Sequence, residues 1–420
     1  MSQTNLNSVI VDLDKEQTEI KPTKDIGLPA KFNLSVLRGQ VVFTSAYTIK
    51  NDKGTWLFQI DNHYDRLLKS FNVMFESKIF PVSKEKFKTY CQELIDSNKN
   101  KLNGNYYQVL ILLIAGKSQS LGQEENAYGN GFGGNLAQLL FIANPMVPKP
   151  NWAFEKGINV CSLPYQREIA DAKPALYLGG IQGQHILSAI NTYYIYHCFL
   201  ENKVSIKNIL KNYEQFSDKN KETFRHLMHD TYNNLDNLET INMQNYVGLD
   251  ETHYQVINRI KTKELSKEKY RYIENNEIAA ILHEVIFTTP SKPHFVLEGA
   301  TFALMGITKQ SELCFIPLEN PTEEAGQGKV LESTTIKLLK EIIKACNIDF
   351  IEKSITLDEA KTFQAFYGFS ATRIFSKDAI LCPPISSIDG HILSGISNEA
   401  NQKIKAIEEK MKVFFATYSY

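Results

Sequence analysis

The apolar residues among the first 145 form a hairpin-like pattern and two nearly continuous runs. From about residue 33 to residue 60 the pattern is strand-like: VVFTSAYTI, a DKG turn and TWLFQI predict a β-hairpin. YYQVLILLIAG and LAQLLFIANP are nearly continuous apolar runs and predict two buried strands joined by a long loop. Residues 1–30 are polar and predict an irregular segment with one short strand, at SVIVDL.

Two segments of the same region have the spacing of amphipathic helices. In DNHYDRLLKSFNVM the apolar residues Leu67, Leu68 and Phe71 recur at helical intervals, and Asp61 is the expected N-cap. SKEKFKTYCQELIDSN predicts a second helix, which begins after Ser83. We therefore expect a mixed or antiparallel sheet with flanking helices.

A proline-rich stretch, NPMVPKPNW, then separates this region from the rest of the chain. It predicts a domain of residues 1–145, a linker of residues 146–156 and a second domain of residues 157–420. The second domain alternates strands and helices, with a helical insertion at about residues 195–272. The predicted fold class is α/β (α+β), with a barrel-like sheet in the second domain and ligands bound at the domain interface.

Composition changes this interpretation little. The net charge is −1 and 22% of the 420 residues are charged, so nothing indicates a nucleic-acid partner. Six scattered cysteines without a CxxC pair favour a reducing, cytoplasmic location. We expect no signal peptide, and the longest apolar runs are too short to cross a membrane.

Two short motifs are weak. GNGFGG, from Gly129 to Gly134, matches the dinucleotide fingerprint, but an apolar strand follows it instead of a helix, which favours a hairpin loop. His226, His229 and Asp230 have metal-ligand spacing on a helix, but no further ligands stand nearby in the sequence, so a solvated helix face and no metal are predicted.

A different set of residues occurs in a fixed order along the chain. His63 and Arg66 stand in HYDRL, Lys173 in YQREIADAKPALYL, and Glu298 in VLEGATFALMGI. The last members are two threonines that begin the helix STTIKLLKEII and a serine that follows AFYGF: Thr334, Thr335 and Ser370.

In this order the residues resemble the fold-type IV family of pyridoxal-phosphate enzymes. This family includes branched-chain aminotransferases, D-amino-acid aminotransferases and aminodeoxychorismate lyases. The resemblance covers roughly residues 36–190 and 275–395. Its most specific parts are DNHYDRLLKS, GINVCSLPYQREIADAKPALYL, VLEGATFAL, and ITLDEAKTFQAF followed by PPISSIDGHIL.

The resemblance implies a role for each residue. Lys173 would form a Schiff base with the pyridoxal 5'-phosphate aldehyde and move the Cα proton. Glu298 would hold the proton of the pyridine nitrogen. Arg66, Thr334 and Thr335 would bind the cofactor phosphate. Ser370 is a weaker phosphate candidate, because the family's turn is altered here to GFSAT. Tyr177 would lie near the cofactor. Without the resemblance, each would be an ordinary surface, turn or capping residue.

The implied function is an aminotransferase that moves an amino group between an amino acid and a 2-oxo acid, in a homodimer. The alternatives are a lyase of the aminodeoxychorismate type, or a degenerate, cofactor-free interaction protein of the same fold. The family often carries an arginine or threonine near the end of the second long strand, facing the substrate carboxylate. Here that strand ends in the apolar LLIAG, so the substrates stay open.

The spacing between two of these residues leaves the cofactor-binding lysine open as well. Lys173 and Glu298 are 298 − 173 = 125 residues apart, whereas one short helix and a strand separate their counterparts in the family. Lys261 and Lys263, in RIKTKELS, lie nearer the family's interval and are the alternative anchors. The stretch from Gly157 onward favours Lys173.

Overall fold

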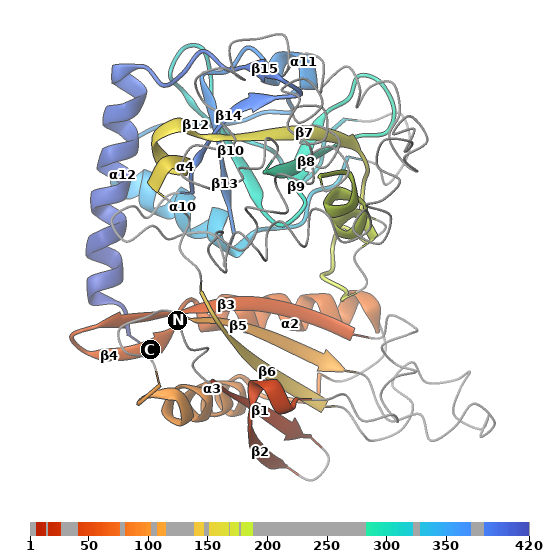
Figure 1. The fold of residues 1–420 in the computed structure, drawn as a ribbon, viewed down its shortest axis with the longest axis vertical. Helices are drawn as coiled ribbons and strands as arrows, with labels where there is room; N and C mark the ends of the chain where they lie inside the picture. Colours follow the sequence, from red (N-terminus) through yellow and green to blue (C-terminus); the bar gives the residue numbers. More distant parts are fainter. Residues whose placement is uncertain are drawn as a thin grey trace, which may run out of the picture.

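The computed structural model describes two lobes, one above the other in Figure 1, each built around a β-sheet. The residues that it describes are 6–13, 16–26, 41–75, 80–101, 107–114, 138–146, 151–167, 169–175, 178–187, 283–321, 328–370 and 382–419.

The first lobe holds a six-stranded sheet with the order β2-β1-β6-β5-β3-β4. Every pair in it is antiparallel. The predicted hairpin and the two buried strands are confirmed, and one more strand, β2, lies in the stretch predicted to be irregular. The strands are β1 (Asn7–Asp12), β2 (Gln17–Pro22), β3 (Val41–Asn51), β4 (Gly54–Leu57), β5 (Tyr107–Ile114) and β6 (Gln138–Pro145).

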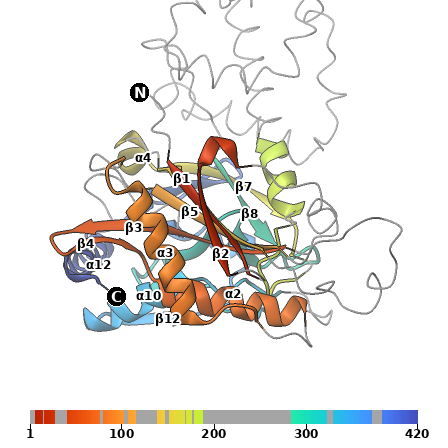
Figure 2. The same cartoon turned by 90° about the horizontal axis from the view of Figure 1, so that it is seen from below.

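Alternation along β3 gives this sheet two different faces. Val42 and Ala46 point into a core made with α2 (Ile60–Met74) and α3 (Lys84–Asn98). Seen from below, both helices lie along this sheet (Figure 2). Phe43 and Ser45 are only partly buried, because they lie on the other face, toward the second lobe.

The start of α2 corrects one sequence prediction. Asp61 is not the N-cap; it lies in the first turn of the helix. The N-cap is Gln59, which has a left-handed backbone (φ 53°) and no capping side chain. The hydroxyl of Tyr418, near the C-terminus, accepts the Gln59 N–H at 2.8 Å. A residue distant in sequence thus takes the place of the local cap. The Ser83 cap of α3 is confirmed, since its side chain accepts from Lys86 N–H.

The second lobe holds a nine-stranded mixed sheet. Its order is β12-β11-β10-β13-β14-β7-β8-β9, with β15 paired to β14. β9 continues into β10 through a tight turn closed by the Gly299 N–H to Phe302 O bond (2.8 Å). The strands are β7 (Ile158–Pro164), β8 (Glu284–Thr288), β9 (Val296–Gly299), β10 (Ala303–Ile307), β11 (Leu313–Phe315), β12 (Phe350–Glu352), β13 (Ala365–Phe369), β14 (Pro384–Ile388) and β15 (His391–Ile392).

Helices join the two lobes. α12 runs along the side of the upper lobe to the lower one (Figure 1), and Asn51 Nδ2 of β3 donates to Tyr418 O (2.7 Å). Tyr47 and Phe58 of the first lobe share an apolar cluster with α10 and α12. The remaining elements are η1 (Thr23–Asp25), α4 (Asn151–Lys156), an unlabelled helix at 178–187, α10 (Thr334–Ala345), α11 (Leu357–Ala360) and α12 (Asn398–Thr417).

Several sequence predictions lie outside the described residues. They are the helical insertion at 195–272, Tyr177, the alternative anchors Lys261 and Lys263, the GNGFGG segment, and the group of His226, His229 and Asp230. The predicted domain boundaries stay a prediction.

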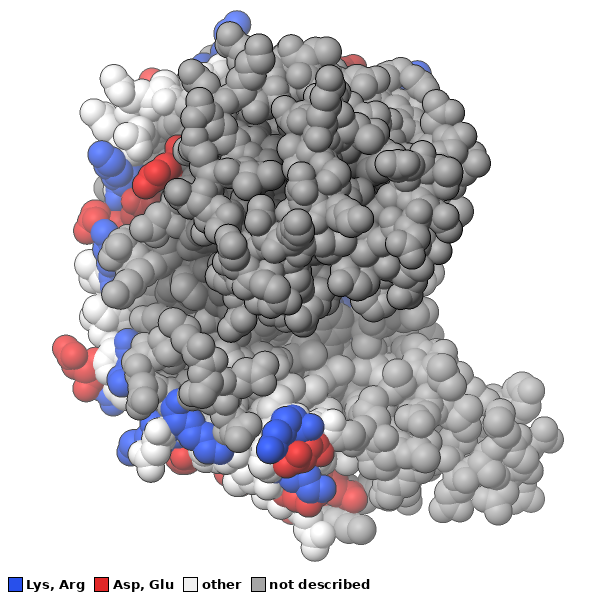
Figure 3. Space-filling model, in the orientation of Figure 1, with Lys and Arg blue, Asp and Glu red and all other residues white. Residues whose placement is uncertain are grey.

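The surface and the helices add two observations. Basic and acidic side chains alternate over the described part of the face in Figure 3, in keeping with the net charge of −1. Among the described residues, no helix is both long enough and apolar enough to span a membrane.

Candidate active site

A cleft lies between the two sheets. The partly buried face of the first sheet lines one side, and the β9–β10 turn, the start of α10 and the end of β13 line the other. Most of the residues singled out in the sequence line this cleft together: Arg66, Lys173, Glu298, Thr335 and Ser370. They come from both lobes and from positions more than 300 residues apart in the sequence, 370 − 66 = 304.

Lys173 is held in place through its backbone. Its carbonyl accepts the Phe43 N–H at 3.0 Å, and its own N–H donates to Ser70 Oγ at 3.0 Å. Pro174 forms a β-bridge to Val42, so this short segment pairs with β3. The Lys173 side chain lies over the Phe43 ring, with Nζ 4.9 Å from its centre. The amine is therefore fixed at the cleft wall.

The surroundings of Lys173 favour its neutral form. Burial lowers the pKa of the Lys173 amine to about 7, and the positive charges of Arg66 and Arg167 contribute to the same shift. Glu298 opposes the shift, since its negative charge favours the ammonium. A large fraction of the amine is thus unprotonated near neutral pH, as a nucleophile or a base requires.

Glu298 lies on β9 and forms a buried ion pair. Arg167 Nε donates to its Oε1 at 2.5 Å and Arg167 Nη2 to its Oε2 at 3.4 Å, with side-chain exposures of only 9% and 6%. The next residue must be glycine, because a Cβ on Gly299 would lie 2.2 Å from the Phe302 ring. The tight turn and the arginine together fix the carboxylate at one end of the cleft.

A cation and a helix start stand together elsewhere in the cleft. Arg66, on α2, crosses to the other lobe and donates to the carbonyl of Glu332, just before α10. Burial lowers the pKa of Arg66 to about 10, which leaves it charged at neutral pH. Ser333 is the N-cap, and its Oγ accepts the Ile336 N–H at 3.2 Å. Arginine, hydroxyls and a helix N-terminus in one place suit an anionic group.

The two threonines of α10 face different spaces. Thr335 lines the cleft, whereas Thr334 lines a neighbouring cavity. His63 is buried behind the cleft, with Nδ1 2.8 Å from Thr44 Oγ1. Burial lowers the pKa of His63 to about 3, and Arg66 and Lys173 add to this effect. His63 is therefore neutral and does not line the cleft.

Sequence reasoning missed three residues of the cleft. The motif YQRE contains Arg167 but does not indicate its role, because its pairing with Glu298 spans 131 residues. Ser45 and Gln108 lie on the cleft face of β3 and β5. The signal was the alternation along β5: Gln108 and Leu110 face the cleft, whereas Val109 and Ile111 are buried. Gln108 lies near the start of β5, whereas the strand ends in apolar residues.

Comparisons with known proteins identify the fold. The sequence matches none of the known protein-family profiles and no curated protein. Among solved structures, the chain is similar to the branched-chain aminotransferase of Thermoproteus uzoniensis with norvaline (TM-score 0.56, 12% identity, 99% of this chain and 96% of that one). It is also similar to the Escherichia coli branched-chain aminotransferase (0.55, 14%, 96% and 92%).

A third similar structure carries the cofactor. It is a hypothetical aminotransferase from Mycobacterium tuberculosis in its PLP-bound form (TM-score 0.52, 13% identity, 96% of this chain and 98% of that one). At these identities the likeness establishes the fold. The chain has the α/β fold of the fold-type IV aminotransferases, as its sequence motifs predicted.

Proposed function

We propose that this chain is a pyridoxal-phosphate-dependent aminotransferase, which moves an amino group between an amino acid and a 2-oxo acid. One observation carries the proposal. A lysine amine with a lowered pKa lines the same cleft as a fixed carboxylate and a cation at a helix N-terminus.

The chemistry of these groups fits pyridoxal phosphate. Lys173 supplies the amine for the aldehyde, and Glu298 the carboxylate for the ring nitrogen. Arg66, Ser333 and Thr335 surround the position suited to the phosphate, with Ser370 at the end of β13 also lining the cleft. When bound, the cofactor supplies an electron sink for the bond broken at the substrate Cα.

The residues of the chain have separate tasks. The Lys173 amine, neutral in part near pH 7, takes the proton from the substrate Cα and later returns a proton. Glu298 holds a proton at the ring nitrogen, and Arg167 orients Glu298 through its two contacts. Phe43, Phe302 and Phe369 line the cleft with apolar surface.

The face of the first sheet supports a neutral contact with the substrate. Ser45 and Gln108 point into the cleft and carry no charge. Of the two arginines in the described lining, Arg66 bonds to Glu332 O and Arg167 to Glu298. We therefore assign Ser45 and Gln108 to hydrogen bonds with the amino acid or 2-oxo acid.

Half-reaction spectra test this function against its alternatives. The protein is loaded with pyridoxal phosphate and mixed with one amino acid at a time, and the absorbance of the cofactor is followed. An aminotransferase converts the cofactor to its amine form, and a 2-oxo acid then restores it. A lyase of the aminodeoxychorismate type does not accumulate the amine form, and a cofactor-free interaction protein takes up no cofactor.

Two further parts of the proposal rest on the sequence: the homodimer on the family resemblance, and the domain division on the proline-rich stretch NPMVPKPNW. The chain forms a homodimer with its active sites near the subunit contact, and it divides into domains at residues 1–145 and 157–420. Size-exclusion chromatography with light scattering measures the first. A single chain in solution would contradict it.

A further inference from the structure

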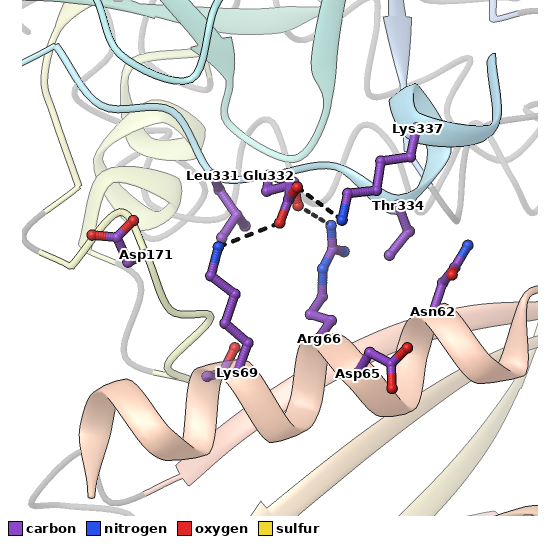
Figure 4. Close-up of a pocket in the computed structure, with 10 residues that line it drawn as sticks. Asn62, Asp65, Arg66, Lys69, Asp171, Leu331, Glu332, Thr334 and Lys337 are labelled. Atoms are coloured by element: carbon purple, nitrogen blue, oxygen red, sulfur yellow. Dashed lines mark hydrogen bonds and ion pairs between the residues drawn. The ribbon is translucent and has the colours of Figure 1, made fainter. Parts of the chain in front are cut away.

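Glu332 stands within a segment that lines the cleft, but its side chain points out of the cleft. Its two neighbours, Leu331 and Ser333, line the cleft together with Arg66. The Glu332 carboxylate lies in a neighbouring cavity, which Figure 4 shows between α2 below and the segment before α10 above. The side chain can therefore affect the cleft through the position of the segment that carries it.

Two residues of the first lobe hold Glu332. Arg66 Nη2 donates to the Glu332 backbone carbonyl, and Lys69 Nζ lies 3.3 Å from the Glu332 carboxylate. Arg66 and Lys69 are about one helical turn apart on α2, so both side chains leave the same side of that helix. Lys337, on α10 of the second lobe, reaches the carboxylate from the opposite side at 2.8 Å. These contacts tie α2 of the first lobe to the start of α10.

The tie joins the two halves of the position proposed for the cofactor phosphate. Arg66 supplies the cation from the first lobe, and Ser333 and Thr335 supply hydroxyls from the second. A phosphate that contacts all three residues needs the two lobes at a fixed separation. The Arg66 guanidinium has several N–H donors, so its bond to the Glu332 carbonyl fixes the group and leaves other donors for the phosphate. An arginine that is already fixed loses less side-chain freedom when an anion binds.

We propose that Glu332 is a positioning residue: its ion pair with Lys69 across the two lobes holds Arg66 beside the start of α10 and so strengthens binding of the cofactor phosphate. The inference rests on the proposed function, because pyridoxal phosphate is the ligand whose affinity it concerns. Through charge alone Glu332 would have the opposite effect, since a carboxylate repels a phosphate. Removal of the carboxylate therefore separates the two effects by their sign.

Titration of the full chain with pyridoxal phosphate and with pyridoxal, followed by the absorbance of the ligand, tests the assignment. Pyridoxal carries the same aldehyde but no phosphate, so a loss confined to pyridoxal phosphate is a loss at the phosphate. We expect Glu332→Gln to weaken pyridoxal phosphate about fivefold and to leave the affinity for pyridoxal unchanged. Lys69→Met, which removes the partner on α2, has the same effect on both ligands as Glu332→Gln.

Two matched variants control for the change of charge. Glu341→Gln makes the same substitution at an exposed residue of α10, and Lys344→Met removes a lysine from its last turn, where the Lys344 Nζ lies over the Phe350 ring. Both leave the affinity for pyridoxal phosphate unchanged. The Lys69→Met/Glu332→Gln double variant loses no more affinity than Glu332→Gln alone, because the two changes remove the same ion pair. Unchanged or tighter binding of pyridoxal phosphate by Glu332→Gln, or an equal loss for both ligands, would overturn the inference.

Modification of Arg66 by phenylglyoxal, mapped by mass spectrometry on cofactor-free protein, distinguishes a failure of this inference from a failure of the proposed function. If the wild-type protein takes up no pyridoxal phosphate, the proposed function is contradicted, and the modification rate decides whether Glu332 positions Arg66. We expect Glu332→Gln to raise the rate at Arg66 about fivefold relative to Arg167, which is bound to Glu298. Equal rates in the variant and wild-type proteins would refute a positioning role.

Discussion

Removing the positive charge of Arg167 tests how the cleft sets the reactivity of Lys173. With a pKa of about 7, roughly half of the Lys173 amine is neutral at neutral pH. At the ordinary value of 10.5 only about three amines in ten thousand would be, so the cleft raises the neutral fraction about a thousandfold. Below the pKa the amine is protonated and unreactive; above it the amine is free to react.

Arg167→Met removes a repelling charge and leaves Glu298 to attract the ammonium. We expect the pKa of Lys173 to rise by about one unit, which lowers the neutral fraction at neutral pH about fivefold. The assay is the pH dependence of Lys173 modification by an amine-specific reagent on cofactor-free protein, measured by mass spectrometry. The peptide that carries the exposed Lys50 normalises the labelling.

A double variant controls for the loss of stability that an unpaired Glu298 would cause. An unpaired Glu298 is costly in a buried site, so Arg167→Met/Glu298→Gln removes both charges at once. Burial is the largest cause of the shift, and the pKa of Lys173 in this variant therefore stays well below 10.5. A wild-type midpoint near 10.5, or a midpoint that Arg167→Met does not move, would refute this reasoning.

Three further substitutions probe the cleft. Gly299→Ala puts a Cβ 2.2 Å from the Phe302 ring and lowers the free energy of unfolding, measured in urea, by about 2 kcal/mol. Phe302→Leu in the same chain relieves the clash and recovers part of that free energy. No recovery would argue against the clash. Ser333→Ala removes the cap of α10, costs about 1 kcal/mol and weakens cofactor retention in dialysis. Gln108→Leu raises KM for the amino acid in steady-state assays and changes unfolding by less than about 0.5 kcal/mol; an unchanged KM would remove Gln108 from the substrate contact.

Local signals explain which parts of the fold could be predicted. The β3–β4 hairpin and the Ser83 cap depend on neighbouring residues, so the sequence pattern found them. The cap of α2 could not be found in this way. Gln59 has a left-handed backbone and bonds to Tyr418, 359 residues away, while Asp61, two residues later, offered a false local signal.

In the site, too, residues that stand in local motifs could be predicted, and residues placed by distant contacts could not. Arg66, Lys173 and Glu298 stand in recognisable motifs, and the fold brings all three to one cleft. Of the predicted pair Thr334 and Thr335, Thr335 lines this cleft and Thr334 a neighbouring cavity. Arg167 needed the fold, since only the pairing of β7 with β8 and β8 with β9 brings the end of β7 near Glu298.

The absorbance spectrum before and after borohydride reduction, followed by peptide mapping of the reduced lysine, tests the central claim most directly. We predict that protein incubated with pyridoxal phosphate shows a visible band, that reduction abolishes it, and that the label is on Lys173. A label on Lys261 or Lys263 would contradict the assignment of the anchor. A colourless protein that takes up no pyridoxal phosphate would contradict the proposed function itself.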